Sequence, residues 1–234
     1  MSKPKKDFKI LQDRIKVEIR NKDLLRTAFV HKSYMNEHRN EDIEDNERLE
    51  FLGDAVLELA VTKHLYEKHP NQAEGEMTAF RSALVKGKQL AEVGKDLNLG
   101  AYLHLSKGED KSGGRDKNYI IANTLEALIG AIYLDHDYDT AEGFIQRFIL
   151  EKLDEIIEKG LHIDSKSQFQ EEAQDKLATT PHYEVLNEEG PDHEKVFTMA
   201  AYIGEEKVAE GTGPSKQKAE EAAAENALKA KGWE

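Results

Sequence analysis

The stretch NERLEFLGDAVLELAVTKHLY (46–66) decides the fold, because one helix there would carry both a core and a line of charge. At roughly 100° per residue, four acidic side chains fall on one stripe about 80° wide. The four are Glu47, Glu50, Asp54 and Glu58. Leucine, valine and alanine cover most of the remaining surface, which is typical of a helix enclosed by others. Like charges at this spacing oppose helix formation by about 0.2–0.5 kcal/mol per pair, so the stripe predicts a cation beside it.

Two simpler interpretations of the acidic stripe stay open. It can be a solvated face, as most runs of charge are, or its first two acids can suit a helix N-terminus capped by Asn46, where carboxylates are favourable. Val61 and Leu65 continue the same stripe, however, so that face does not simply point at water. The pattern therefore favours a metal site over a structural cluster of acids.

A second helical stretch, NYIIANTLEALIGAIYLD (118–135), repeats this placement of oxygen donors in apolar surroundings. Asn123 and Glu126 are three residues apart, and mostly isoleucine, leucine and alanine surround them. Oxygen ligands from two packed helices suit a hard cation, Mg²⁺ before Ca²⁺, with Mn²⁺ as a substitute. We therefore expect one metal site that draws on both helices.

The period of the hydrophobic pattern changes near residue 160. Before it, apolar residues recur at helical spacing; after it, one helix precedes three short extended runs and an alanine-rich helix. The runs are HYEVLN (182–187), KVFTMAAYI (195–203) and EKVAEGT (206–212). We predict an all-α domain at 1–158, a linker at 159–164 and a small α+β domain (α-β-β-β-α) at 165–234.

The composition of the 234 residues excludes several classes of protein. The chain has no cysteine, which excludes disulfides, thiol nucleophiles and zinc sites built on thiolates. Its apolar runs are far shorter than a membrane span and no signal-type segment is present, so we expect a cytoplasmic protein without a membrane partner. A net charge of −13 argues at first sight against a nucleic-acid partner. Residues 161–234 alone carry 8 basic and 16 acidic side chains.

Two acidic motifs resemble those of the ribonuclease III family. NERLEFLGDAVLEL (46–59) is similar to the family's signature, and LEALIGAIYLD (125–135) is similar to its second motif. Further similar stretches are HKSYMNEH (31–38), GEMTAFRSALV (75–85) and SKGEDKSGGRDKN (106–118), and the α-β-β-β-α tail resembles a double-stranded-RNA-binding domain.

The resemblance covers essentially the whole chain and implies a homodimeric endoribonuclease. Such an enzyme uses Mg²⁺, and no small organic cofactor, to hydrolyse double-stranded RNA to 5′-phosphate and 3′-hydroxyl ends. Structured RNA such as ribosomal precursors is its usual substrate.

The same resemblance assigns roles to individual side chains. Glu50, Asp54 and Glu126 match three of the four core acids that bind metal and support catalysis. Two further acids border the cleavage site in the family, and one aromatic residue packs into a socket on the partner subunit; here these are Glu47, Glu74 and Phe51. Ordinary core packing remains an equal alternative for the aromatic side chain.

Asn123 departs from the family's commonest pattern, in which most members have an aspartate three residues before the second-motif glutamate. An amide oxygen can still bind Mg²⁺ or orient a coordinated water, but it brings no negative charge. One hypothesis is an active site with altered metal affinity or preference. The alternatives are a catalytically impaired RNA-binding protein and an engineered variant.

The tail contains candidate RNA contacts. Lys216 and Lys218 follow Ser215, a candidate N-cap of the last helix. Cations in the first turn of a helix oppose its dipole unless an anion binds there. The start of this helix is therefore either a phosphate-binding site or an ordinary solvated helix end. The family has a second lysine where this chain has Gln217, which should weaken phosphate contact. The resemblance adds three groups that face the minor groove, Gln170 with its neighbour Glu171, Gln174 and His193.

Three functions can be distinguished from one another by experiment. The first is a Mg²⁺-dependent double-strand-specific endoribonuclease, and the second is a non-catalytic RNA-binding protein of the same fold. The third is an unrelated helical phosphohydrolase that acts on small nucleotides, which leaves the tail unexplained. Duplex RNA that is bound but not cut favours the second, and RNA that is not bound favours the third.

Overall fold

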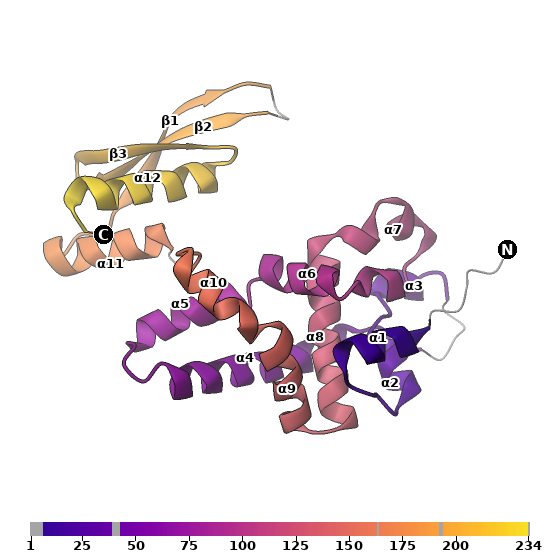
Figure 1. Ribbon diagram of the computed structural model, residues 1–234. Coiled ribbons are helices and arrows are strands. Elements are labelled where there is room, and N and C mark those ends of the chain that lie inside the picture. The colour runs from indigo at the N-terminus through magenta and orange to yellow at the C-terminus, as the bar shows by residue number, and fades with distance from the viewer. Residues whose placement is uncertain (1–6, 39–42, 163, 192–193, 234) are drawn as a thin grey trace. The chain divides into compact units, whose positions relative to one another are not determined.

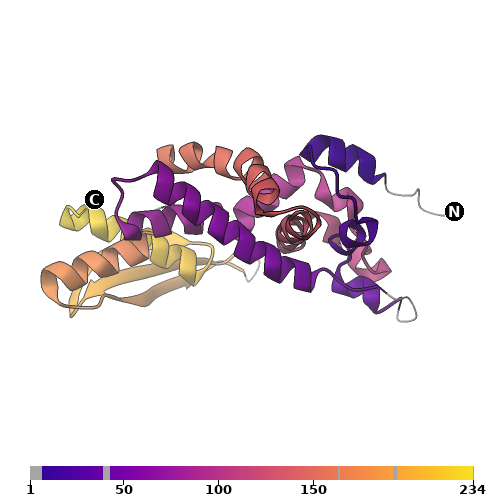
Figure 2. The same cartoon turned by 90° about the horizontal axis from the view of Figure 1, so that it is seen from below.

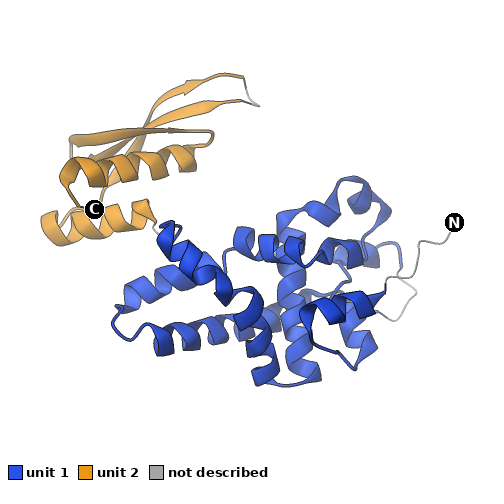
Figure 3. Cartoon of the chain, in the orientation of Figure 1, with its two compact units in different colours: residues 1–162 blue, residues 163–234 orange. Residues whose placement is uncertain are grey.

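Two helices, α4 (Glu47–Lys68) and α8 (Asn118–Asp135), form the centre of the first of two units in the computed structural model (Figure 1). The structure describes residues 7–38, 43–162, 164–191 and 194–233. The chain divides into residues 1–162 and residues 163–234 (Figure 3). No helix in the described ranges is both long and apolar enough to cross a bilayer.

In its described residues, the first unit is built of helices joined by turns and loops. Besides α4 and α8 it contains α1 (Phe8–Ile15), α2 (Lys22–Thr27), α3 (Lys32–Met35), α5 (Glu74–Leu84), α6 (Gly87–Asp96), α7 (Lys107–Lys111), α9 (Tyr138–Phe148) and α10 (Leu153–Glu158). Three short 3₁₀ helices join them, η1 (Leu99–Tyr102), η2 (Gly114–Asp116) and η3 (Leu150–Lys152). Figure 2 shows the unit from below, with α4 as a long purple helix.

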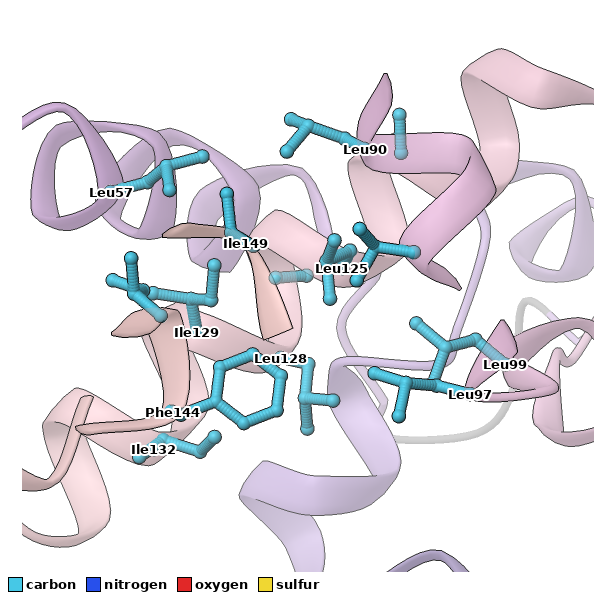
Figure 4. Packing of buried hydrophobic residues seen from close by; sticks show 14 of the residues in the cluster. Leu57, Leu90, Leu97, Leu99, Leu125, Leu128, Ile129, Ile132, Phe144 and Ile149 are labelled. Atoms are coloured by element: carbon cyan, nitrogen blue, oxygen red, sulfur yellow. The ribbon is translucent and has the colours of Figure 1, made fainter. Parts of the chain in front are cut away.

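The core of this unit surrounds α8. Leu125, Leu128 and Ile129 of that helix are fully buried, and they lie among side chains such as Leu57 of α4 and Phe144 of α9 (Figure 4). Because apolar side chains cover nearly every face of α8, other helices must enclose it on all sides. Burying one such side chain contributes about 1.5–3 kcal/mol.

Two glycines let α4 and α8 approach each other more closely than ordinary side chains allow. A Cβ atom on Gly53 would lie 1.8 Å from the carbonyl oxygen of Glu126, and one on Gly130 would lie 2.3 Å from the carbonyl oxygen of Leu49. Both distances are far below van der Waals contact. The glycines therefore bring the two backbones together and fix which residues of the two helices are neighbours.

Asn46 lies at the N-cap position of α4, as one alternative interpretation of the stripe has it, but its side chain does not cap the helix. Its side chain makes no capping hydrogen bond; the amide donates to the carbonyl oxygen of Ala28 at 3.4 Å, in a position only 3% exposed. Asp45 accepts instead from the backbone N–H of Glu47, at 3.2 Å. Asn46 also donates its backbone N–H to Val30 at 2.9 Å, so it ties the start of α4 to an earlier segment of the chain.

The second unit is a three-stranded antiparallel sheet with two helices. Its elements are α11 (Ser165–Leu177), β1 (His182–Glu189), β2 (Val196–Ile203), β3 (Glu206–Gly213) and α12 (Lys216–Lys231), and the strand order is β1-β2-β3. Helix α12 packs on β2, β3 and α11. A separate core of Phe169, Ile203 and Leu228 with several alanines fills the space between them. The predicted fold class, an all-α unit followed by α-β-β-β-α, is confirmed.

The close approach at Gly53 generates a test of stability. We expect Gly53→Ala to lower the free energy of unfolding by about 3 kcal/mol, because the new methyl group meets backbone atoms that cannot move away easily. Urea denaturation of purified protein measures the change. Gly143→Ala in α9 is the matched control, since nothing lies within 4 Å of its Cβ position, and it should stabilise by about 0.5–1 kcal/mol. Equal effects of the two substitutions would contradict the packing argument.

Candidate active site

Four oxygen-bearing side chains meet where α4 and α8 cross. Helix α4 supplies Glu50 and Asp54, on either side of Gly53, and α8 supplies Asn123 and Glu126. Because the position of Gly53 touches the backbone of Glu126, the carboxylates of both helices are brought to the same place. The Asn123 amide donates a hydrogen bond to the Glu50 carboxylate, and Glu126 interacts electrostatically with both Asp54 and Glu50.

Two carboxyl groups of this site, those of Glu50 and Glu126, resist ionisation. Burial, with the charges of Asp54 and Glu50 nearby, raises the pKa of Glu126 from 4.5 to about 7. Burial also raises the pKa of Glu50, and the hydrogen bond from Asn123 partly offsets that effect. Burial disfavours the charged form of an acid, and so does a second carboxylate close by. At neutral pH the site is therefore a place where positive charge is favoured.

The chemistry of these donors fits a hard divalent cation. Three carboxylates and one amide offer only oxygen atoms, which Mg²⁺ and Mn²⁺ prefer to nitrogen or sulfur. Within the described ranges, however, no three histidine, aspartate or glutamate side chains are arranged as a metal-binding group. The residues fit the ion by chemical type, and their side chains are not arranged as a set of ligands.

The four acids of the α4 stripe lie in three different surroundings. Glu47 lies 2.9 Å from the Lys32 ammonium group, and Glu58 lies 3.5 Å from the Arg81 guanidinium. Only Glu50 and Asp54 are left to interact with α8. Sequence reasoning missed both basic partners, because Lys32 and Arg81 lie 15 and 23 residues from the acids with which they pair.

Glu74 is not part of this cluster within one chain. It begins α5 and lines a cavity of about 220 Å³ together with Thr62, Tyr66 and Met77. Tyr66 is twelve residues beyond Asp54 on the same helix, which corresponds to roughly 18 Å at 1.5 Å per residue.

Phe51 is 82% exposed on α4, next to Glu50. The alternative that Phe51 is an ordinary core residue is therefore wrong. Burying its ring requires a surface outside this chain's own core.

The second unit presents the residues expected to contact RNA, except His193, which lies outside the described residues. Gln170 and Gln174 are exposed one turn apart on α11. At the start of α12, the Ser215 hydroxyl accepts the backbone N–H of Lys218 at 3.2 Å, so the predicted cap is present. Lys216 is the first residue of this helix and is also exposed.

Comparison with known proteins gives matches to both units. Residues 21–153 match the model of the Ribonuclease-III-like family, and residues 165–231 match the double-stranded RNA binding motif. Ribonuclease 3 of Listeria monocytogenes is 41% identical over 221 residues, which cover 93% of this chain and 95% of that protein. Ribonuclease 3 of Pelotomaculum thermopropionicum is 42% identical over 219 residues, which cover 94% and 91%. The solved nuclease domain of Campylobacter jejuni ribonuclease III superposes with a TM-score of 0.58 at 38% identity, and covers 62% of this chain and 97% of that domain.

A helical nuclease unit followed by a double-stranded RNA binding motif defines an endoribonuclease that acts on double-stranded RNA. The chain belongs to the ribonuclease III family. The resemblance stated from the sequence motifs is confirmed, and the third hypothesis, a helical phosphohydrolase of unrelated family, is wrong.

The raised pKa of Glu126 predicts how stability depends on pH without divalent metal. Below pH 4.5 the carboxyl is protonated in both the folded and the unfolded protein. As the pH rises towards 7 the unfolded chain ionises first, so folding loses stability, up to about 3 kcal/mol above pH 7. We therefore expect Glu126→Gln to raise the free energy of unfolding by about 1–3 kcal/mol at pH 8 and to leave it almost unchanged at pH 4.5.

Urea denaturation in EDTA at the two pH values measures this difference. The exposed residue Glu151 provides the control, and Glu151→Gln should change stability by less than about 0.5 kcal/mol at either pH. If Glu126→Gln raised the free energy of unfolding equally at both pH values, the effect would be due to packing rather than to charge.

Proposed function

We propose that this protein hydrolyses phosphodiester bonds of double-stranded RNA in a Mg²⁺-dependent reaction that leaves 5′-phosphate and 3′-hydroxyl ends. The observation that supports the proposal most directly is the meeting of Glu50, Asp54, Asn123 and Glu126 at the contact of α4 with α8, where the pKa of Glu126 is about 7. Structured RNA such as ribosomal precursors is the substrate that we propose.

In this proposal the side chains of the site have two roles, which are binding of the cation and transfer of a proton. Mg²⁺ bound there supplies Lewis acidity toward the phosphate. Glu50, Asp54 and Glu126 hold the cation through carboxylate oxygens, and Asn123 adds an amide oxygen or keeps Glu50 oriented by its hydrogen bond. With a pKa near 7, the Glu126 carboxyl can hold a proton and release it when positive charge arrives.

Asn123 leaves a second function to consider, a catalytically impaired double-stranded-RNA-binding protein of the same fold. This residue places one carboxylate fewer in the site than an aspartate would. We propose that catalysis remains and that the missing charge weakens metal binding.

Duplex RNA cleavage across a Mg²⁺ titration tests both functions. We expect this chain to cut, and Asn123→Asp to lower the half-saturating Mg²⁺ concentration about tenfold or more, because an added carboxylate attracts the cation. Asn118→Asp, the same change at the exposed first residue of α8, should leave the Mg²⁺ dependence unaltered. Duplex that is bound but never cut, with Mg²⁺ or Mn²⁺, would establish the RNA-binding function instead.

We propose further that the protein is a homodimer in which Phe51 of each copy enters the other. The exposed ring of Phe51 needs a site of burial, and the cavity of about 220 Å³ between α4 and α5 is lined by Leu65, Tyr66 and Met77, which suit an aromatic side chain. The Campylobacter jejuni nuclease domain has a structurally flexible region involved in dimer formation, which supports a dimer here as well. In such a dimer, Glu74 at the rim of the cavity would border the acids of the second copy, beside Glu47.

Removing the Phe51 ring tests this arrangement. We expect Phe51→Ala to raise the dimer dissociation constant about 30-fold or more, as the loss of a buried aromatic anchor does at other interfaces. Sedimentation velocity over a range of concentrations measures it. Ile10→Ala removes another exposed apolar side chain, 56% exposed on α1, and should leave the constant unchanged. A dimer of unaltered strength in Phe51→Ala would refute the socket.

For the second unit we propose that Gln170 and Gln174 reach the minor groove while Lys216 and Lys218 contact phosphate. The two glutamines share one exposed face of α11. The capped start of α12 leaves backbone N–H groups available to an anion. The proposed contact of His193 rests on the sequence alone.

A further inference from the structure

Every lysine of the second unit is held by a carboxylate of the same unit. Residues 161–234 contain eight lysines and no arginine. Each of the eight has its ammonium group within 3.7 Å of a glutamate oxygen. The pairs are Lys166–Glu220, Lys176–Glu172, Lys195–Glu188, Lys207–Glu210, Lys216–Glu188, Lys218–Glu221, Lys229–Glu225 and Lys231–Glu206. All the lysine charges of a unit that binds a polyanion are thus paired with glutamate carboxylates before any RNA binds.

One glutamate of this set serves two lysines from different parts of the chain. Glu188 near the end of β1 lies 2.8 Å from Lys216, the first residue of α12, and 3.7 Å from Lys195, just before β2. Both ammonium groups lie over the ring of Phe197, at 5.7 and 6.0 Å from its centroid. The pairing with Lys216 also lowers the pKa of Glu188, which therefore stays ionised well into the acidic range.

The Glu188 carboxylate makes contacts with Lys216 and Lys195 that a phosphate group could make in its place. A carboxylate between two ammonium groups, at the start of a helix, satisfies the same charges as a phosphate oxygen does. An RNA phosphate that contacts Lys216 must either share its ammonium group with Glu188 or displace the carboxylate, and in both cases the carboxylate stays close to the phosphate. Like charges at that range repel each other, and salt screens the repulsion.

We propose that Glu188 competes with the RNA phosphate for Lys216 and so limits the affinity of this protein for double-stranded RNA. The inference rests on the proposed contact of Lys216 with phosphate. Two consequences distinguish it from a merely structural ion pair. Removing the charge of Glu188 strengthens RNA binding, and the gain is largest at low ionic strength, where the competition is least screened.

Binding of the 234-residue chain to duplex RNA in EDTA, which removes the divalent metal that the proposed cleavage requires, tests the inference. Fluorescence anisotropy of a labelled duplex of about 30 base pairs is suitable, since the motif spans roughly 16. We expect Glu188→Gln to lower the dissociation constant about two- to fivefold at roughly 0.05 M salt. The gain should be smaller at about 0.3 M salt, because a Debye length of roughly 6 Å screens more of the repulsion than the longer one at about 0.05 M does.

Glu225→Gln is the matched control. It removes one negative charge and one ion pair, with Lys229 at 2.6 Å, and its side chain is 57% exposed on α12. An equal gain in Glu225→Gln would assign the effect to net charge and overturn the role of Glu188. Unchanged or weaker RNA binding by Glu188→Gln would also overturn the proposed competition. Unchanged binding would mean that the carboxylate has no effect on RNA affinity, and weaker binding would mean that it positions Lys216 for RNA.

Two further variants separate this inference from the proposed RNA contact. Lys216→Ala should weaken binding; unchanged binding would refute the contact of Lys216 itself and the competition with it. If Lys216→Ala weakens binding but Glu188→Gln does not strengthen it, the contact stands and only the competition fails. In the double variant the gain from Glu188→Gln should be smaller than in the single variant, and a gain of the same size would overturn competition at Lys216.

Discussion

The approach of α4 to α8 at Gly53 and Gly130 is the constraint on which the first unit depends. A Cβ atom at either glycine would meet a backbone carbonyl of the other helix at 2.3 Å or less. The same contact fixes the neighbours of Glu126, so a single packing requirement sets the centre of the core and assembles the charged site beside it. A substitution at the contact of α4 with α8 is therefore expected to change both the stability of the unit and the arrangement of the acidic site, because Glu50, Asp54 and Glu126 lie at or next to the residues in contact.

Much of the fold could be predicted from the sequence, because its signals are local. Helical periodicity, the change of pattern near residue 160 and the cap at Ser215 each depend on residues close together in the chain. The burial of Asn46 against Ala28 and the pairing of Glu58 with Arg81 could not be predicted, because both depend on how distant segments pack. A sequence pattern also could not decide between exposure and core packing for Phe51, since an apolar residue on a helix suits either.

For the candidate site, the sequence indicated which residue types would gather but not how they would interact. The oxygen donors of α4 and α8 could be predicted from their spacing, and two of the four acids on the stripe turned out to have basic partners elsewhere. The elevated pKa of Glu126 depends on burial, which the core around α8 imposes. The folded chain thus tolerates mutual repulsion among carboxylates because apolar burial nearby contributes far more free energy than the repulsion costs.

The paired lysines of the second unit bear on which polyanions it can recognise. A ligand must compete with carboxylates that are already in place, so isolated phosphates or sparsely charged chains gain little by displacing them. A duplex presents phosphates on two strands at close and regular intervals, and several contacts can be exchanged together. With the proposed competition, the surplus of acid in this unit would favour RNA that presents many closely spaced phosphates over sparsely charged chains.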